Sequence, residues 1–320
     1  MSRESPELNM PCDWIIPVYR FEKSFAVNIP EREYWSELVE NPNGSLTWFT
    51  DGSRRDNLTG SGIFCPTFKK ELSMPLGEYM TVFITEIYGI MECCRVIREC
   101  HNPGSLHINI CTDSQGAIKA ISGYKFSSSL VLECRDSLQK LSESNQVSLT
   151  WVPGHSNIGG NEKADELARL ASSNRFIGPE PAMAVSISTL QRIILDWKAQ
   201  RFKHHWNSLS IARQARNSIK INRKNAKYCL SLSRTNLRKL TSILTGHNSL
   251  KKHLHTIGVS NDPSCDMCGD VETTEHFLCQ CPAYIKSRAL HLGSYTIKYN
   301  TIWSITPANI LKFINKTKRI

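Results

Sequence analysis

Leu46-Thr47-Trp48-Phe49-Thr50-Asp51-Gly52-Ser53 is the stretch of this 320-residue sequence that decides the fold. Its first five residues are mostly aromatic, β-branched or aliphatic, which is typical of a buried β-strand. Asp51 ends this run and is followed by a glycine and a serine. An ionised carboxylate is costly to bury without a partner, so it contributes nothing to the packing of a strand. Asp51 therefore indicates chemistry at the edge of a sheet.

Three further acids lie at the edges of apolar segments. Asp113 ends the run Leu106–Thr112, Glu86 opens an apolar-periodic helix, and Asp165 lies in the first turns of another. Four converging carboxylates repel one another unless cations neutralise them. The four acids together predict a hard-metal site that hydrolyses phosphodiesters.

Each acid also has an ordinary structural interpretation. Asp51 would be a turn residue, Glu86 a first-turn acid favoured by the helix dipole, Asp113 a helix N-cap, and Asp165 a solvated helical acid. These interpretations do not explain why the acids follow one another in a fixed order of strand, helix, strand and helix.

The surrounding pattern predicts an α/β fold, in which a mixed five-stranded sheet is flanked by helices. The expected strands are 46–50, 60–65, 71–76, 106–112 and 147–152, and the expected helices are 85–100, 115–121, 130–142 and 161–172. Asn102-Pro103-Gly104 is expected to stop the first of these helices. Several cysteines in these segments are interpreted as small buried hydrophobic residues.

Five motifs in this order resemble those of the ribonuclease H family, over about residues 45–172. The motifs are Thr50-Asp51-Gly52-Ser53, Thr85-Glu86, Thr112-Asp113-Ser114, Trp151-Val152-Pro153-Gly154-His155 and Asn161-Glu162-Lys163-Ala164-Asp165-Glu166-Leu167-Ala168. The resemblance implies a ribonuclease H-like fold and a hydrolase that cleaves the RNA strand of RNA–DNA hybrids. It also implies two Mg²⁺ ions, for which Mn²⁺ is an alternative.

The resemblance implies a role for each site residue. Asp51 would bridge both metals, Glu86 and Asp113 would hold the metal at the leaving 3′ oxygen, and Asp165 would hold the metal that activates water. His155 would assist proton transfer or product release, and its alternative is an exposed loop histidine. Two rival functions stay open, namely a non-catalytic nucleic-acid-binding module descended from such an enzyme and a DNA-cleaving nuclease or transposase.

Charge divides the chain into an acidic and a basic half. Residues 1–174 carry 16 Lys and Arg against 22 Asp and Glu, a net charge of −6, whereas residues 175–320 carry 23 against 7, a net charge of +16. The basic half suits a polyanion, with a merely solvated basic tail as the alternative. The expected domains are a leader or linker over 1–44 that ends in Asn41-Pro42-Asn43-Gly44, a ribonuclease H domain over 45–174, a basic helical region over 175–260, a zinc-binding module over 261–290 and a tail over 291–320.

The zinc-binding module is expected from a C-x2-C-x7-H-x4-C spacing. Its candidate ligands are Cys265, Cys268, His276 and Cys281, with Cys279 as an alternative fourth ligand. Two close thiolates and a later His/Cys pair fit tetrahedral zinc, and the alternative is reduced cysteines without metal. The region 235–290 resembles the zinc-binding tail that follows ribonuclease H in non-LTR retrotransposon polyproteins, which implies structural zinc and nucleic-acid binding.

Other features restrict location and partners. The sequence has no run of about 18 apolar residues and no apolar signal core at its N-terminus, so we expect an intracellular protein, nuclear or cytoplasmic, that is neither secreted nor bound to a membrane. No Tyr/Phe-x-Asp-Asp motif occurs, so we expect no reverse transcriptase domain in this chain.

Overall fold

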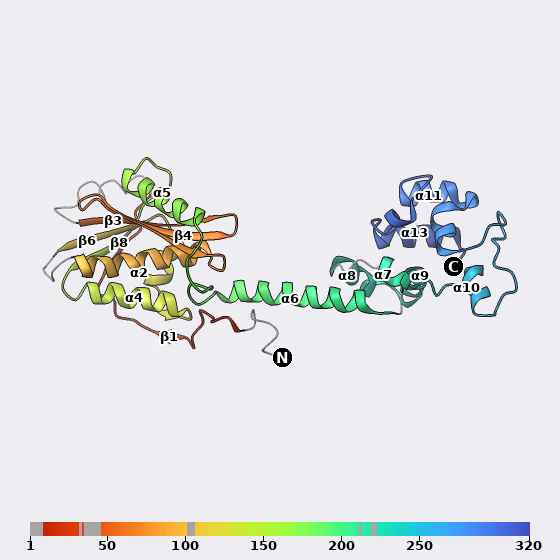
Figure 1. Cartoon of the computed structure of the whole chain (residues 1–320), viewed down its shortest axis with the longest axis horizontal. Helices are drawn as coiled ribbons and strands as arrows, with labels where there is room; N and C mark the ends of the chain where they lie inside the picture. The colour runs from red at the N-terminus through yellow and green to blue at the C-terminus, as the bar shows by residue number, and fades with distance from the viewer. Residues whose placement is uncertain (1–8, 32–33, 35–45, 101–105, 211–212, 219–222) are drawn as a thin grey trace. The chain divides into compact units, whose positions relative to one another are not determined.

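A computed structural model describes residues 9–31, 34, 46–100, 106–210, 213–218 and 223–320. The chain divides into two compact units, Met1–Lys198 and Ala199–Ile320 (Figure 1). The turn expected at Asn41–Gly44 and the helix stop expected at Asn102–Gly104 lie outside the described residues. Among the helices of the described part, none is long and apolar enough to cross a membrane.

The first unit is built on a mixed sheet with the strand order β2-β8-β6-β3-β4-β5. Its strands are β2 (Ala26–Asn28), β3 (Leu46–Arg55), β4 (Leu58–Cys65), β5 (Lys70–Gly77), β6 (His107–Thr112) and β8 (Gln146–Trp151). The pairs β2–β8, β8–β6 and β6–β3 are parallel, and β3–β4 and β4–β5 are antiparallel. All five strands expected from the sequence are present.

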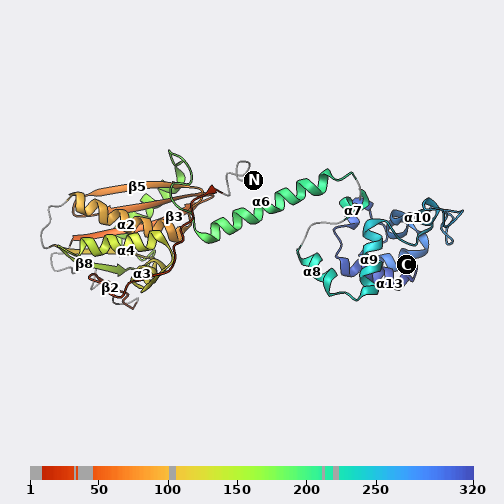
Figure 2. The same ribbon diagram turned by 90° about the horizontal axis from the view of Figure 1, so that it is seen from below.

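Helices cover both faces of this sheet. They are α2 (Val82–Cys100), α3 (Gln115–Ser122), α4 (Ser129–Leu141) and α5 (Gly159–Ser173). Helices α2 and α4 lie on one face and α5 on the other, as Figures 1 and 2 show. The main core lies between the sheet and the α2–α4 face, and Cys65, Cys93, Cys94 and Cys134 are fully buried in it as the sequence predicts.

Helix α5 packs closely on β4 because two glycines leave room for its backbone. A Cβ atom on Gly62 would lie 2.2 Å from the carbonyl oxygen of Ala164, and one on Gly60 would lie 2.3 Å from the Cβ of Ala171. Contacts under 3 Å are not tolerated, so larger residues at these positions would push α5 away from the sheet. The two glycines thereby determine how close α5 lies to the sheet, and with it the position of Asp165, the residue after Ala164.

The segment expected to be a leader contributes a sixth strand, so the expectation of five strands was wrong. Ala26–Asn28 pair in parallel with Ser148–Thr150 of β8, and Phe25 beside them is buried. The strand β1 (Val18–Tyr19) pairs with β7 (Lys125–Phe126) in a separate two-stranded ribbon. Strands of two or three residues are too short to show an alternating pattern, which is why the sequence did not indicate them.

Asp13 ties the same segment to α4. Its carboxylate accepts hydrogen bonds from the hydroxyls of Ser128 and Ser129, both at 2.6 Å, and from the backbone N–H of Leu130 at 3.0 Å. These donors lie at the N-terminus of α4, where a negative charge is favoured. The segment is thus part of the first unit.

The second unit is helical. After α6 (Ile187–Ser208), which spans the boundary between the units, its elements are α7 (Arg213–Ser218), α8 (Arg223–Ser231), α9 (Arg234–Thr245), α10 (Lys251–Thr256), η3 (His276–Gln280), η4 (Pro282–Tyr284), α11 (Ile285–Leu292), α12 (Tyr299–Ile302) and α13 (Pro307–Thr317). One core joins α9, η3, α11 and α13, with Phe277 and Phe313 at ring-centroid distance 5.2 Å. The stretch 291–320, expected as a tail, therefore supplies part of this core.

Candidate active site

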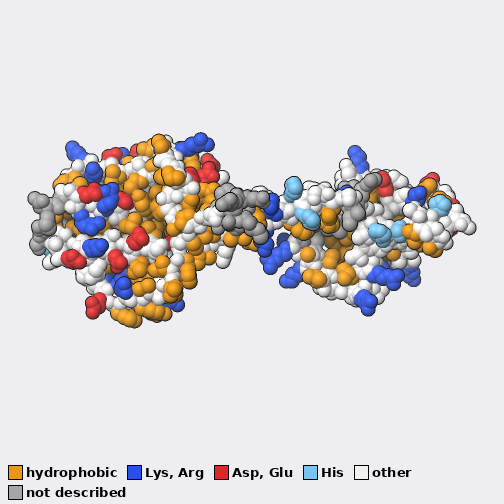
Figure 3. Space-filling view, turned by 60° about the horizontal axis from the view of Figure 1, so that its bottom comes forward, with side chains coloured by type: hydrophobic (Ala, Val, Ile, Leu, Met, Phe, Trp, Pro, Cys, Tyr) orange, Lys and Arg blue, Asp and Glu red, His pale blue; other side chains and the backbone are white. Residues whose placement is uncertain are grey.

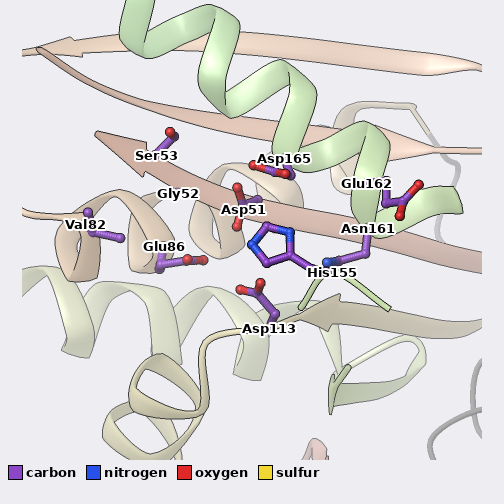
Figure 4. A pocket seen from close by; sticks show the side chains of 10 residues that line it. All are labelled: Asp51, Gly52, Ser53, Val82, Glu86, Asp113, His155, Asn161, Glu162 and Asp165. Atoms are coloured by element: carbon purple, nitrogen blue, oxygen red, sulfur yellow. The ribbon is translucent and has the colours of Figure 1, made fainter. Parts of the chain in front are cut away.

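Three of the expected acids meet at one end of the parallel strands. Asp51 lies on β3, Glu86 in the second turn of α2, and Asp113 directly after β6. Each offers one carboxylate oxygen, and these oxygens lie within 4.8 Å of one another (Figure 4). The site opens into a cavity of about 270 Å³, whose lining also includes His155 and Asp165.

Asp51 does not end its strand, contrary to the sequence-based expectation. The strand β3 continues to Arg55, and Asp51 pairs with Gly62 of β4. On its other side β3 pairs with β6 only as far as Thr50, which is opposite Thr112. Asp51 and Asp113 are therefore the first residues beyond that parallel pairing, and this register brings their side chains together.

The ordinary structural interpretations of two acids are excluded. Ser114 caps α3, because its hydroxyl accepts from the backbone N–H of Ala117 at 3.3 Å, so Asp113 is not the N-cap. The first turn of α2 contains no acid, so Glu86 is not a first-turn residue. Glu86 is 4% exposed and accepts a hydrogen bond from the hydroxyl of Thr112 at 3.3 Å.

Burial and mutual repulsion disfavour the ionised form of this cluster. Burial, followed by the charges of Asp113 and Asp165, raises the pKa of Asp51 to about 8. Burial and the charges of Asp51 and Asp113 raise the pKa of Glu86 well above its ordinary range. The pKa of Asp113 is also raised, first by burial and then by Asp165. Oxygen ligands whose charges lack compensation fit a hard divalent cation such as Mg²⁺.

Asp165 lines the same cavity but is not one of the three clustered acids. Arg169 holds its carboxylate in a bidentate ion pair, with Nε donating to Oδ1 at 2.8 Å and Nη2 donating to Oδ2. The two residues are four apart on α5, so they lie on the same helix face. The structure therefore brings Asp165 to the site and gives it a protein cation, Arg169, as a partner that the sequence did not indicate.

His155 lies on the loop between β8 and α5 and faces the acids (Figure 4). Its charge lowers the pKa of Asp113, which opposes the larger effect of burial. The loop can approach because residue 154 is glycine, whose Cβ would lie 2.6 Å from Oδ2 of Asp113. The indole N–H of Trp151 donates to the carbonyl of Asp113 at 3.0 Å and fixes the base of the loop.

Asn161 is the second residue that links this loop region to the acids. It is 3% exposed, and its hydrogen bond to Asp113 favours the carboxylate form. Because Asn161 is buried, its side chain positions Asp113 and is not available to contact nucleic acid.

The model of the RNase H family matches residues 43–173. Residues 43–173 therefore form an RNase H-type domain. The six-stranded mixed sheet with helices on both faces is its fold. A relative is the retrovirus-related Pol polyprotein from type-1 retrotransposable element R1 2 of Nasonia vitripennis, 28% identical over 186 residues. The matched region is 54% of this chain and 44% of that polyprotein, so the chain spans less than half of the length of its relative.

Beyond the RNase H domain, four Cys and His residues form a second cluster. The ligand atoms of Cys265, Cys268, His276 and Cys281 lie within 4.8 Å of one another. Cys268 Sγ is 3.3 Å from His276 Nε2 and 4.0 Å from Cys281 Sγ. Sulfur ligands about 2.3 Å from a tetrahedral zinc lie about 3.8 Å apart, so this donor set fits zinc.

The geometry distinguishes between the two candidates for the fourth ligand. Cys281 belongs to the cluster, whereas Cys279 is 4% exposed and packs in the hydrophobic core of the second unit. On the other side of the cluster, the N–H of Gly269 donates to the carbonyl of Cys265 at 2.9 Å. Gly269 has φ +83°, which a side chain would strain. This tight turn brings the first two thiols together.

Arg288 holds the backbone next to the Cys and His cluster in place, a role that the sequence did not indicate. It is 1% exposed and donates to the backbone carbonyls of Leu278, Cys281 and Tyr295 at 3.0, 2.6 and 3.0 Å. The hydrogen bond to Cys281 orients the segment that carries this ligand. If Zn²⁺ were bound by three thiolates, the site would carry a net charge of −1, which the nearby guanidinium would help to compensate.

Proposed function

We propose that this chain is a metal-dependent endoribonuclease of retroelement origin that hydrolyses the RNA strand of RNA–DNA hybrids. The observation that carries the proposal is the convergence of Asp51, Glu86 and Asp113, with oxygens within 4.8 Å of one another, in an RNase H domain. Burial and mutual repulsion raise their pKa values, so the three carboxylates need further positive charge to be ionised together. Two Mg²⁺ ions, or Mn²⁺ as an alternative, would supply that charge.

The positions of the acids support distinct roles. Figure 4 shows Asp51 between Asp113 and Asp165, and the charges of both act on it, so Asp51 is suited to share two ions. Glu86 and Asp113 would then hold one ion, and Asp165 would hold the other. When bound, two divalent ions stabilise the attacking and leaving oxygens of an in-line displacement. His155 lines the same cavity and its charge acts on Asp113, so in this proposal it would move a proton at the leaving oxygen or assist product release.

Substrate choice is proposed from the polar groups around the cavity. Recognition of a hybrid requires contacts to RNA 2′-hydroxyls, for which small polar side chains and backbone donors are suited. Gly52 and Ser53 line the cavity beside Asp51 and provide such groups. We further propose that Cys265, Cys268, His276 and Cys281 bind a structural zinc, and that the basic second unit binds nucleic acid.

Cleavage of a labelled hybrid tests the proposal. The full chain is incubated in Mg²⁺ with RNA labelled at its 5′ end and annealed to DNA, beside the same RNA alone and annealed to RNA. We expect cleavage of the hybrid only, and a loss of at least about 100-fold in Asp113→Asn, because one ligand of the cluster is removed. Asp56→Asn is the matched control, since Asp56 is exposed in the β3–β4 turn at φ +54°, which asparagine adopts readily.

Two outcomes would contradict this proposal. If the unmodified chain binds the hybrid and does not cleave it, the chain is a binding module. If Asp113→Asn and Asp56→Asn cleave equally, the acids of this cavity are not the active site.

A further inference from the structure

The second unit contains a long stretch without acidic residues. Residues 199–261 carry 13 Lys and Arg, 5 His and no Asp or Glu. Figure 3 shows one face of the molecule, and on the second unit Lys, Arg and His side chains are spread over that face while Asp and Glu are rare. The positive charge of this stretch therefore has few acidic side chains to compensate it.

Part of this stretch forms a cleft of about 450 Å³ along α9 and α10. Arg238 and Lys239 come from α9, and His247 and His253 come from the turn after α9 and from α10. The two imidazoles lie edge to face at a centroid distance of 5.4 Å. Leu254 and Ile257 add an aliphatic surface. Among the residues of the cleft that the structure describes, none is Asp or Glu.

The wall of the cleft is anchored to the zinc-type module. Asn248 donates to the hydroxyl of Thr274 at 3.1 Å, and the backbone N–H groups of Lys251 and Lys252 donate to the side chain and the carbonyl of Glu272 at 2.7 and 3.2 Å. Both acceptors lie between Cys268 and His276. Glu272 is 1% exposed and is also paired with Arg319. The cleft is therefore built on a buried polar network, and its shape depends on the fold of the module.

We infer that this cleft binds one unpaired nucleotide of a nucleic-acid strand. The phosphate would contact Arg238 and Lys239, and the base and sugar would pack on the two imidazoles, Leu254 and Ile257. Cations beside an apolar surface with imidazole rings match a nucleotide, which has an anionic and a flat aromatic part. The assignment rests on the proposed function, because the bound strand belongs to the nucleic acid that the RNase H domain cleaves.

The test measures binding of a fluorescent 12-nucleotide DNA strand to the full chain by anisotropy, without Mg²⁺, at several salt concentrations. We expect Arg238→Gln/Lys239→Gln to weaken binding about tenfold and to lower the salt slope by about 1.4, at about 0.7 per charge on a single strand. The matched control is Lys312→Gln/Lys316→Gln, which removes the same charge from exposed positions of α13 in the same unit. Unchanged circular dichroism spectra and melting temperatures show that both variants are folded.

A second probe tests the nucleotide part. An abasic strand of equal length and charge is expected to bind the unmodified chain about tenfold more weakly. Equal binding of the two strands, or equal weakening by the two double variants, overturns the inference. Cleavage of the hybrid by the same preparations is measured separately. If either of these contradicting results is obtained while the unmodified chain cleaves the hybrid, this inference fails and the proposed function stands.

Discussion

Asp51→Asn is expected to make the metal-free protein more stable, although it removes a proposed metal ligand. Burial and the charges of Asp113 and Asp165 raise the pKa of Asp51 from 3.8 to about 8. A carboxyl whose pKa is raised by folding favours the folded state only while it is protonated. The folded protein therefore loses stability as pH rises from about 4 to 8, and the penalty is complete above pH 8. Asparagine does not titrate and avoids this penalty.

The size of the effect follows from the pKa. The difference between about 8 and 3.8, at about 1.4 kcal/mol per pKa unit, gives an upper limit of about 6 kcal/mol. The repulsion is shared with Asp113, whose own raised pKa lets protonation there relieve part of it, and the cavity is open to water. We therefore expect about 2 to 3 kcal/mol at pH 8.5, which is about 5 to 10 °C in melting temperature for a unit of this size.

Thermal unfolding followed by circular dichroism at pH 4.5 and 8.5 measures the effect. The buffer is free of Mg²⁺ and contains no chelator, because a chelator would also remove the zinc proposed for the second unit. We expect Asp51→Asn to melt above the unmodified chain at pH 8.5 and close to it at pH 4.5. Added Mg²⁺ should stabilise the unmodified chain and leave Asp51→Asn almost unchanged.

Asp56→Asn is the control, because this acid lies in the exposed β3–β4 turn. It should melt like the unmodified chain at both pH values. A melting temperature of Asp51→Asn that is lower than that of the unmodified chain at pH 8.5 would refute the reasoning, since Asp51 would then stabilise the folded protein without metal.

Three other outcomes are expected. Arg169→Gln removes the cation that holds Asp165, so half-maximal hybrid cleavage should need several-fold less Mg²⁺, and an unchanged Mg²⁺ dependence would contradict this role of the ion pair. Cys281→Ser should purify without zinc, whereas Cys279→Ser should retain one zinc per chain and lose only stability; metal analysis of both decides between the two cysteines. Asp13→Ala removes three hydrogen bonds to the start of α4 and should destabilise the first unit by about 2 kcal/mol in urea unfolding, with no change if the segment were a detached leader.

Much of the first unit could be predicted because its signals are local. The apolar runs around β3, β6 and β8 have the length and composition of strands, and the helix α2 has a clear apolar period. The acids stood out because each interrupts such a pattern. Short pieces such as β2 could not be predicted, because their pairing partner lies more than 100 residues away and their own sequence carries no period.

The sequence by itself determined the order of the acids, the zinc-type spacing of Cys265 to Cys281 and the separation of charge between the two halves. Only the tertiary structure decided that Asp51 lies within a strand, that Arg169 holds Asp165, and that Cys281 rather than Cys279 joins the cluster. It also decided that Arg238 and His253 share one cleft. The physical reason is that residue type and spacing report local structure, over a few helical turns or one strand. Strand register and side-chain direction depend on contacts between segments far apart in the sequence.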